Sequence, residues 1–197
     1  MNEEVVLARY ISDGIEKEVT ISNYNQFIIE KEKNAIADFI YGRLHSRYIN
    51  PFEEHGSINK RKNGFSMMAN YCLLIETLQS FINGWGDSDR KSGVAFKQFF
   101  TENQNFTELN GKGIEIYKHI RCGILHQGET TNGWRITRKG IKLLDENNKM
   151  IDAYIFGERI TKSLNDYKQC LKSSEWDSKQ WDNFRVKMRK VIANTIA

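Results

Sequence analysis

The sequence predicts a mainly α-helical fold, and three observations lead to this prediction. The 197 residues contain a single proline, Pro51, so long segments hold no residue that breaks a helix. Fourteen glycines fall mostly between runs in which apolar residues recur every three or four positions, as on one face of a helix. A chain of this length can also bury a core without disulfides or metal. We therefore expect one domain over residues 1–197.

The N-terminal part is expected to form an arm and one long helix. Residues 1–22, which include VVLARYI, predict a short strand or a loose arm. Asn23 and Gln26 have the spacing of a capping box at a helix start. Apolar residues then recur at helical spacing until Pro51 ends the run, so we expect one helix between Asn23 and Asn50.

Loops and helices alternate over the rest of the chain until the period of the apolar residues changes after Gly128. Polar residues 51–63 predict a surface loop. Beyond Gly128, apolar and polar residues alternate around the turn signal DENN, as in a small β-hairpin. The expected helices are 64–83, 94–102, 112–127, 153–171 and 178–196, and the expected β-hairpin is 133–152.

The cysteines indicate a reducing compartment. Cys72, Cys122 and Cys170 form no CxxC pair, and each falls in a helical pattern, as packed thiols do. No run of about eighteen apolar residues occurs, and the start MNEEVV does not resemble a signal peptide. We therefore expect a cytoplasmic protein without a membrane partner.

Basic residues concentrate toward the C-terminus. Residues 1–133 carry 15 Lys and Arg against 17 Asp and Glu, whereas residues 134–197 carry 14 against 8. This imbalance predicts either an anionic partner or a solvated basic surface.

The helix expected over 112–127 carries the clearest chemistry. Arg121 and His126 are five positions apart, which is about 140° around a helix and about 7.5 Å along it. They are therefore not neighbours, but both reach one groove if a second copy of the helix covers the sector between them. Two small residues, Cys122 and Gly123, would allow that close approach. The expected buried side of the helix is Ile114, Tyr117, Ile120, Ile124 and Leu125.

Such a groove suits the cleavage of RNA without a metal. A histidine near neutral pH can take the proton of a ribose 2′-hydroxyl or protonate the leaving oxygen. An arginine can hold the phosphate and stabilise the charge that develops in the transition state. The spacing alone does not separate this role from a structural histidine and a surface arginine.

A metal-binding ridge is the rival interpretation of the same helix. Glu115, His119, Cys122 and His126 follow spacings of four, three and four, which places them on one stripe. However, ligands from a single helix rarely surround a metal ion, and the sequence has no CxxC or HExxH motif to complete the site. We therefore expect no metal and no other cofactor.

The string HIRCGILHQGE, with an arginine, four residues and a histidine, resembles the motif of the HEPN superfamily. The similarity extends upstream to GFSMMANYCLLIETLQSFINGW and downstream to WRI, IDA and SEWDSKQW, which resemble one bacterial branch of that superfamily. The resemblance implies a HEPN-like helical bundle that dimerises through the motif helices. It also implies a metal-independent endoribonuclease, usually in toxin, defence or stress systems.

The resemblance assigns roles to single residues. Arg121 and His126 match the catalytic pair, and the supporting residues are Cys122, Gln127 and Glu129. Many active members carry Asn, Asp or His where this chain has Cys122. Members that are controlled by modification of a tyrosine two residues after the histidine have that tyrosine where this chain has Gly128.

RNA and a second copy of the chain are the expected partners, with an antitoxin or another protein as a further one. The residues expected to contact the RNA backbone are Arg135, Arg138, Lys139 and Lys142, with a solvated face as the alternative. A second hypothesis is a non-catalytic module that binds RNA, a nucleotide or a partner protein, which Cys122 favours. A purely structural subunit is the third.

Overall fold

The computed structural model describes residues 4–53 and 63–196, so most of the loop expected over 51–63 lies outside the described residues. The chain divides into two compact units. The first comprises Met1–Arg47, Ser80–Asp87 and Leu164–Ala197, and the second comprises Tyr48–Gln79 and Ser88–Ser163. The expectation of a single domain stays a prediction.

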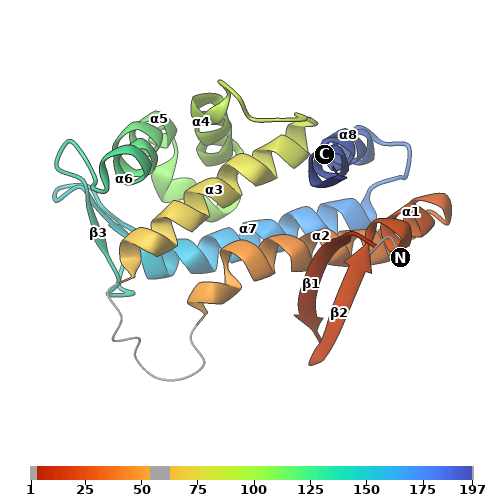
Figure 1. The fold of residues 1–197 in the computed structure, drawn as a ribbon. Coiled ribbons are helices and arrows are strands. Elements are labelled where there is room, and N and C mark those ends of the chain that lie inside the picture. The colour runs from red at the N-terminus through yellow and green to blue at the C-terminus, as the bar shows by residue number, and fades with distance from the viewer. Residues whose placement is uncertain (1–3, 54–62, 197) are drawn as a thin grey trace. The chain divides into compact units, whose positions relative to one another are not determined.

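The predicted mainly helical class is confirmed (Figure 1). Four of the expected helices are present as α3 (Gly64–Asn83), α4 (Ser92–Glu102), α7 (Ala153–Ser173) and α8 (Lys179–Ile196). Two of them, α3 and α7, contribute to both units. Over the described ranges, no helix is both long and apolar enough to cross a membrane.

A β-hairpin opens the first unit. β1 (Val6–Ser12) and β2 (Ile15–Thr20) pair in antiparallel fashion. Asp13 and Gly14 between them have φ values of 53° and 75°, as a type I′ turn requires. The expected short strand is confirmed as β1, whereas the loose arm is wrong. The second strand was not expected, and the turn lets it pair with the first.

Two helices replace the one long helix expected after residue 22. They are α1 (Ile21–Ile29) and α2 (Lys33–Tyr48). Lys31 between them has a φ of 55°, a left-handed value that interrupts a right-handed helix. The capping box also lies one turn earlier than expected, because Thr20 and Asn23 each accept the other's backbone N–H with a side-chain oxygen.

Aromatic side chains form the core of the first unit. The ring of Phe81, near the end of α3, lies 5.6 Å from that of Phe184 in α8 and 6.4 Å from that of Tyr167 in α7, between centroids. Tyr24 of α1 and Trp181 of α8 are also buried. None of the residues expected to act on RNA belongs to this unit.

Phenylalanines dominate the core of the second unit. Phe106, in the 3₁₀ segment η2 (Gln104–Leu109), has its ring 4.8 Å from that of Phe156 in α7 and 5.3 Å from that of Phe99 in α4. The ring of Tyr71 in α3 stacks on that of Phe156, with 6.0 Å between the two centroids. The core therefore joins α3, α4 and the first half of α7. A short 3₁₀ segment, η1 (Asn50–Phe52), also belongs to this unit.

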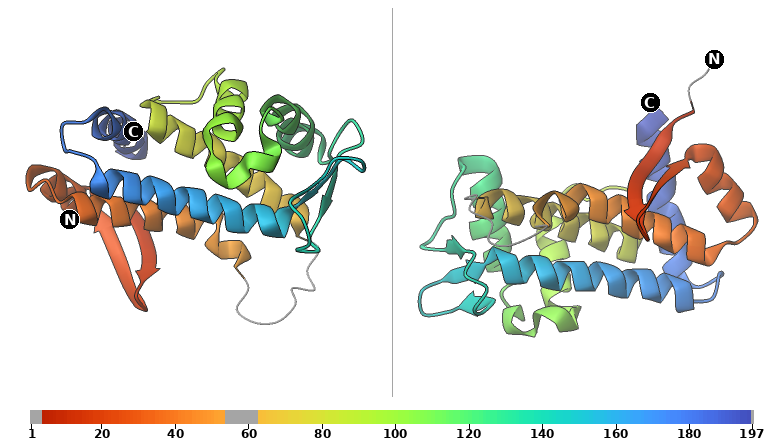
Figure 2. Two further views of the ribbon diagram at one scale, coloured as in Figure 1. Left: turned by 180° about the vertical axis from the view of Figure 1, so that it is seen from behind. Right: turned by 90° about the horizontal axis from the view of Figure 1, so that it is seen from below.

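A three-stranded sheet replaces the β-hairpin expected over 133–152. Its strands lie in the order β3 (Arg135–Thr137), β5 (Met150–Asp152) and β4 (Leu144–Asp145), with β5 antiparallel to β4 and parallel to β3. The hairpin prediction is right for β4 and β5 and wrong for β3, whose parallel pairing leaves no short turn signal. Asp152 joins the sheet to α7, since its carboxylate accepts the backbone N–H groups of Tyr154 and Ile155. Figure 2 shows the sheet at this end of α7.

Candidate active site

The helix that carries Arg121 and His126 runs from Gly113 to Gln127 and is called the motif helix below. It consists of α5 (Gly113–Ile116), a π-helical segment η3 (Tyr117–Arg121) and α6 (Cys122–Gln127). In the π-helical segment the Cys122 backbone N–H donates to the Tyr117 carbonyl, five residues back. Such wide turns insert about one extra residue and occur often at functional sites. The expectation of a helix over 112–127 is confirmed, with this irregularity in its middle.

The buried side of the motif helix differs from the one expected. Ile116 and Ile120 are fully buried, whereas Ile114 and Leu125 are 39% and 40% exposed. Ile114 is exposed because its neighbour Gly113 is the residue that packs closely against α4: a Cβ on Gly113 would lie only 2.5 Å from the Phe96 carbonyl oxygen. Leu125 is exposed because the extra residue in η3 rotates α6 relative to α5.

Gly123 faces the chain itself. A Cβ at this position would lie 2.5 Å from the Glu129 carbonyl oxygen and 3.3 Å from the Thr130 Cα. The chain therefore turns back across Gly123 after the helix ends at Gly128, which has a left-handed φ of 70°. The expectation that Gly123 makes room for a second copy is wrong, because residues 129–131 already occupy that space.

Arg121 is held by Glu76 of α3. Its Nε lies 2.7 Å from one Glu76 carboxylate oxygen and its Nη2 lies 3.4 Å from the other. The Ser92 hydroxyl, in the first turn of α4, donates to the same carboxylate at 3.0 Å. One carboxylate thus ties α3, α4 and the motif helix together at the arginine. The side chains of Arg121 and Glu76 are only 16% and 8% exposed, so a well-aligned ion pair is needed to offset the loss of hydration.

The surroundings of Arg121 keep it charged. Burial opposes the charge, but the hydrogen bonds and the negative charge of Glu76 outweigh it, so the pKa of the Arg121 guanidinium is raised above its usual range. Tyr117 lies one turn earlier on the motif helix, and the Arg121 guanidinium carbon is 5.9 Å from the centre of its ring. Cys122 hydrogen-bonds with both side chains. The bond to Cys122 and then burial raise the pKa of Tyr117, so its hydroxyl stays protonated near neutral pH.

The two histidines of the motif helix differ in their surroundings. Nδ1 of His119 lies 2.9 Å from the Thr131 hydroxyl, and its Nε2 lies 3.4 Å from the Asn132 side-chain nitrogen. Because the Asn132 amide nitrogen can only donate, the neutral tautomer with a proton on Nδ1 satisfies both contacts. The carbonyl oxygen of His119 also accepts the Thr131 backbone N–H. His119 is therefore a structural histidine that anchors the chain after the motif helix.

His126 is exposed at the end of the motif helix. Among residues 4–53 and 63–196, none forms a hydrogen bond or an ion pair with its ring. The structure does not bring His126 and Arg121 together within one copy, since Arg121 is directed toward α3 and His126 is open to solvent.

A hollow lies beside the end of the motif helix. It has a volume of about 640 Å³ and includes Glu129, one of the expected supporting residues, and Arg135, one of the expected RNA contacts. Glu129 also accepts the Thr130 backbone N–H with its carboxylate. Gln127, the other supporting residue on this stretch, is exposed. The full lining is Phe65, Glu129, Thr130, Gly133, Trp134, Arg135 and Ile136.

The four basic residues expected to contact RNA do not form one group. Arg135 is exposed and donates to the Asn148 carbonyl at 3.2 Å. Lys142 is exposed and pairs with Asp145 at 3.2 Å, and Lys139 is exposed. Arg138 is half-buried, and its side chain packs against Gly64 at the start of α3. Arg135 and Lys139 are therefore the basic side chains best placed to meet a ligand.

The metal-binding ridge is not assembled. Across the described part of the chain, no group of three or more His, Cys, Asp and Glu side chains is arranged to hold a metal ion. His119, a member of the ridge, has both ring nitrogens directed at Thr131 and Asn132. The stripe that linear spacing predicts is also interrupted by the π-helical segment.

Glu76 belongs to the candidate site, but the sequence motif does not include it. It is the one charged residue between Gly64 and Asn83, in a helix whose other side chains are apolar or neutral. A carboxylate on a buried helix requires a partner, so this isolated charge was the signal that could have found it. Comparisons with known proteins add no family: no protein-family model, curated protein or solved structure matches the chain.

Proposed function

We propose that the chain is a metal-independent endoribonuclease of the HEPN type. One observation carries the proposal beyond the resemblance of the motif. On a single helix, Arg121 is fixed in place by Glu76, while His126 is exposed. A fixed phosphate clamp and an accessible proton-transfer group are the two functions that RNA cleavage needs.

Arg121 keeps donors for a phosphate in this arrangement. A guanidinium has five N–H groups, and the bonds to Glu76 involve Nε and Nη2. The remaining donors can bind the non-bridging oxygens of a phosphate. The carboxylate holds the guanidinium plane in one orientation, so less conformational entropy is lost when the phosphate binds.

His126 would act on the ribose. As a base it takes the proton of the 2′-hydroxyl, whose oxygen then attacks phosphorus while the bond to the 5′-oxygen breaks. The leaving 5′-oxygen needs a proton, which a second, protonated histidine can supply. A homodimer provides this second group as His126 of the other copy. The products are a 2′,3′-cyclic phosphate and a 5′-hydroxyl, and no metal takes part.

Exposed apolar residues on the motif helix support the dimer. Ile114 and Leu125 are 39% and 40% exposed, although both have the side chains of core residues. A second copy of the helix would cover them and bring the two His126 rings toward one groove. We further propose that the enzyme works in the cytoplasm in a toxin or defence system, under the control of a protein partner.

A non-catalytic module is the second candidate function, and Cys122 favours it. Its thiol hydrogen-bonds with Tyr117 and Arg121, at the position where many active HEPN members carry a stronger polar group. In this reading the groove binds RNA and does not cut it.

Cleavage of a labelled RNA in excess EDTA separates the two candidates. Wild type should cut, and Arg121→Ala and His126→Ala should not. Lys118→Ala, an exposed change on the same helix, is the matched control and should cut like wild type. Binding without cleavage by wild type would establish the module instead, and cleavage that survives in both variants would reject the assigned residues.

A further inference from the structure

The hollow beside the end of the motif helix lies where three segments of the second unit meet. Phe65 comes from the first turn of α3, Glu129 follows the motif helix, and Arg135 begins β3. Two of these segments pack closely, because a Cβ on Gly64 would lie 3.1 Å from a side-chain carbon of Ile136. Figure 1 shows the start of α3 beside β3. The fold therefore fixes the walls of the hollow.

Phe65 gives the hollow a flat apolar surface. Its side chain is aromatic and the residue is 36% exposed. Trp134, which is 4% exposed, and Ile136 also belong to the apolar part of the lining. An exposed aromatic ring is a platform on which any nucleobase can stack. The apolar part of the hollow thus suits a base but does not select one.

Glu129 and Arg135 add one charge of each sign to the lining. One carboxylate oxygen of Glu129 accepts the backbone N–H and the hydroxyl of Thr130. Arg135 donates from one guanidinium nitrogen to the Asn148 carbonyl. In the described part of the chain, neither Glu129 nor Arg135 has an ion-pair partner. The carboxylate repels a phosphate and the guanidinium repels a cation, so the best ligand is neutral and has both donors and acceptors.

Guanine is the base whose edges match these two groups. Its N1–H and N2–H groups lie side by side and can donate to the two oxygens of one carboxylate, whereas the Watson–Crick edges of adenine, cytosine and uracil each have one donor group. Its O6 and N7 can accept two N–H groups of one arginine. The two contacts use different sides of the ring, so both can form while the base is stacked.

We propose that this hollow binds a guanine of the RNA. The base stacks on Phe65, its N1–H and N2–H groups donate to Glu129, and its O6 and N7 accept from Arg135. The inference rests on the proposed function, since it names the base that is read beside His126. Glu129 follows His126 by three positions, so the guanine lies near the bond that is cut. In this assignment Glu129 selects the substrate and takes no part in proton transfer.

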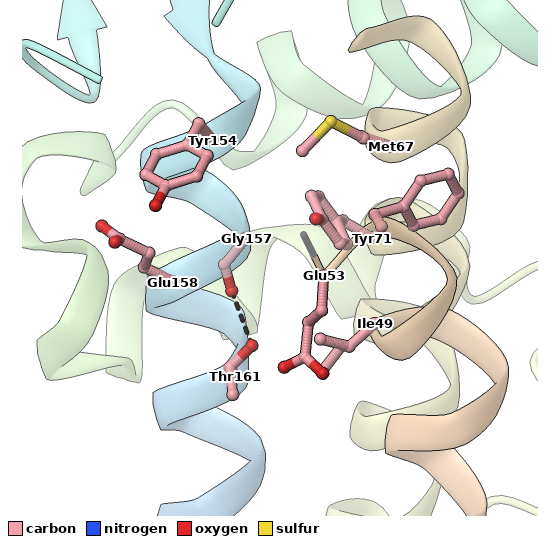
Figure 3. A pocket seen from close by; sticks show the side chains of 9 residues that line it. Ile49, Glu53, Met67, Tyr71, Tyr154, Gly157, Glu158 and Thr161 are labelled. Carbon is pink, nitrogen blue, oxygen red and sulfur yellow. Dashed lines mark hydrogen bonds between the residues drawn. The ribbon is translucent and has the colours of Figure 1, made fainter. Parts of the chain in front are cut away.

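Another hollow of the same unit supplies a matched control. It has a volume of about 410 Å³, and Figure 3 shows side chains of α3, of α7 and of the segment around η1 facing it. Glu158 of α7 lines this hollow and, like Glu129, is an exposed carboxylate. Of the residues that the structure describes, none between 113 and 136 belongs to its lining. Glu158→Gln therefore removes the same charge from the same unit and leaves the proposed guanine site intact.

Fluorescence anisotropy of short labelled oligonucleotides with the full chain tests the proposal. The probes contain 2′-deoxyribose, which lacks the attacking hydroxyl, so wild type can bind them but not cut them. An all-uracil probe is compared with probes that carry one central guanine, hypoxanthine or adenine. The guanine probe should bind at least tenfold tighter than the uracil and adenine probes, and hypoxanthine, which lacks the 2-amino group, a few fold more weakly than guanine. Equal affinities for guanine and adenine would overturn the proposal.

Three variants assign the contacts, with Glu158→Gln as the control that should bind like wild type. Glu129→Gln and Arg135→Gln should each reduce the preference for guanine over adenine by about fivefold or more. Phe65→Ala should weaken the binding of every probe about tenfold and leave the preference unchanged, because stacking does not depend on the identity of the base. Circular dichroism would verify that each variant is folded. An undiminished preference in Glu129→Gln would reject the site.

Cleavage of RNA in EDTA separates this inference from the proposed function. If wild type prefers the guanine probe but does not cut RNA, the guanine site stands and the chain is a binding module. If wild type cuts RNA and shows no preference for guanine in cleavage or in binding, the enzyme stands and the guanine site is rejected.

Discussion

Arg121 and Glu76 form a two-point ion pair, with Nε and Nη2 of the arginine 2.7 Å and 3.4 Å from the two carboxylate oxygens. The residues are 45 positions apart in the sequence, and the pair joins the motif helix to α3. Because Ser92 bonds to the same carboxylate, the orientation of Arg121 depends on three helices. The pair therefore links three helices, and under the proposed function it also orients the arginine that binds the phosphate.

Removal of the Glu76 carboxylate should destabilise the fold. Glu76→Ala leaves a largely buried Arg121 without its counter-charge, which costs about 3 kcal/mol or more. Glu76→Gln keeps the shape and part of the hydrogen bonding, so the loss should be smaller. Urea denaturation measures both, with Glu102→Gln as an exposed control that should change stability by less than about 0.5 kcal/mol. If Glu76→Ala is as stable as this control, the ion pair is not part of the fold.

Two glycines of the second unit should respond to alanine in opposite ways. Gly123→Ala places a Cβ 2.5 Å from the Glu129 carbonyl oxygen, so the backbone must shift at a cost of about 1–3 kcal/mol. Gly93→Ala on α4 meets only ordinary contacts, the nearest at 3.5 Å. It should leave the stability unchanged or raise it by up to about 1 kcal/mol. Equal stability of the two variants in thermal unfolding would contradict the packing of residues 129–131 over the motif helix.

The proposed dimer should depend on Leu125. A charge at this exposed position in Leu125→Glu disfavours burial against a second copy without disturbing the core. The variant should elute as a folded monomer in size-exclusion chromatography with light scattering, and wild type as a dimer. Ile141→Glu, at an apolar residue that is 78% exposed, is the control and should remain dimeric. A monomeric wild type, or a dimeric Leu125→Glu, would count against assembly through the motif helix.

Alkaline pH should destabilise the protein through Cys72. Burial and then the charge of Glu76 raise the pKa of its thiol above the ordinary value of 9.0. In the unfolded chain the thiol ionises above that pH, whereas in the folded chain it keeps its proton. The protonated thiol therefore makes its full contribution to the free energy of unfolding below about pH 9. Above that pH the free energy of unfolding falls by up to about 1.4 kcal/mol per pH unit for this one group.

Urea denaturation at pH 7, 9 and 10 measures this loss. Cys72→Ala lowers stability at pH 7 because it leaves a small cavity, but it should lose less between pH 9 and 10 than wild type does. The buried hydroxyls of Tyr71 and Tyr167, whose pKa values are also raised by burial, add to the slope only above about pH 10. Identical pH slopes for the variant and wild type would show that the thiol does not contribute.

Helical periodicity predicted most of the fold, and it failed where the backbone leaves regular geometry. The helix over 64–83 was predicted to the residue, since its apolar stripe ends at Gly84. The break at Lys31 was not predicted, because a lysine with positive φ has no sequence signal of the kind that glycine gives. The strand at β3 was expected, but its parallel pairing was missed: its partner β5 lies 15 residues later in register, and no local pattern specifies such a pairing.

The sequence predicted which residues of the motif helix belong to the candidate site, but not how they are arranged. The resemblance of the motif indicated Arg121 and His126, and the wheel angle showed that they do not touch. The partner of Arg121 lies on another helix, so only the isolated charge of Glu76 pointed to it. The π-helical segment was invisible to a periodic analysis, because the pattern of apolar residues assumes a constant rotation per residue. This is why Leu125, which follows the π-helical segment, was assigned to the wrong face.

The most direct test of the central claim compares the cleavage rates of wild type and His126→Ala on one labelled RNA in excess EDTA. His126 is exposed, so its replacement should leave the free energy of unfolding within about 0.5 kcal/mol of wild type. The rate of cleavage to a 2′,3′-cyclic phosphate should nevertheless fall by about a factor of 10² to 10⁴, the usual contribution of a proton-transfer group. A His126→Ala variant that cuts RNA at the wild-type rate would contradict the assignment of the motif helix as an active site.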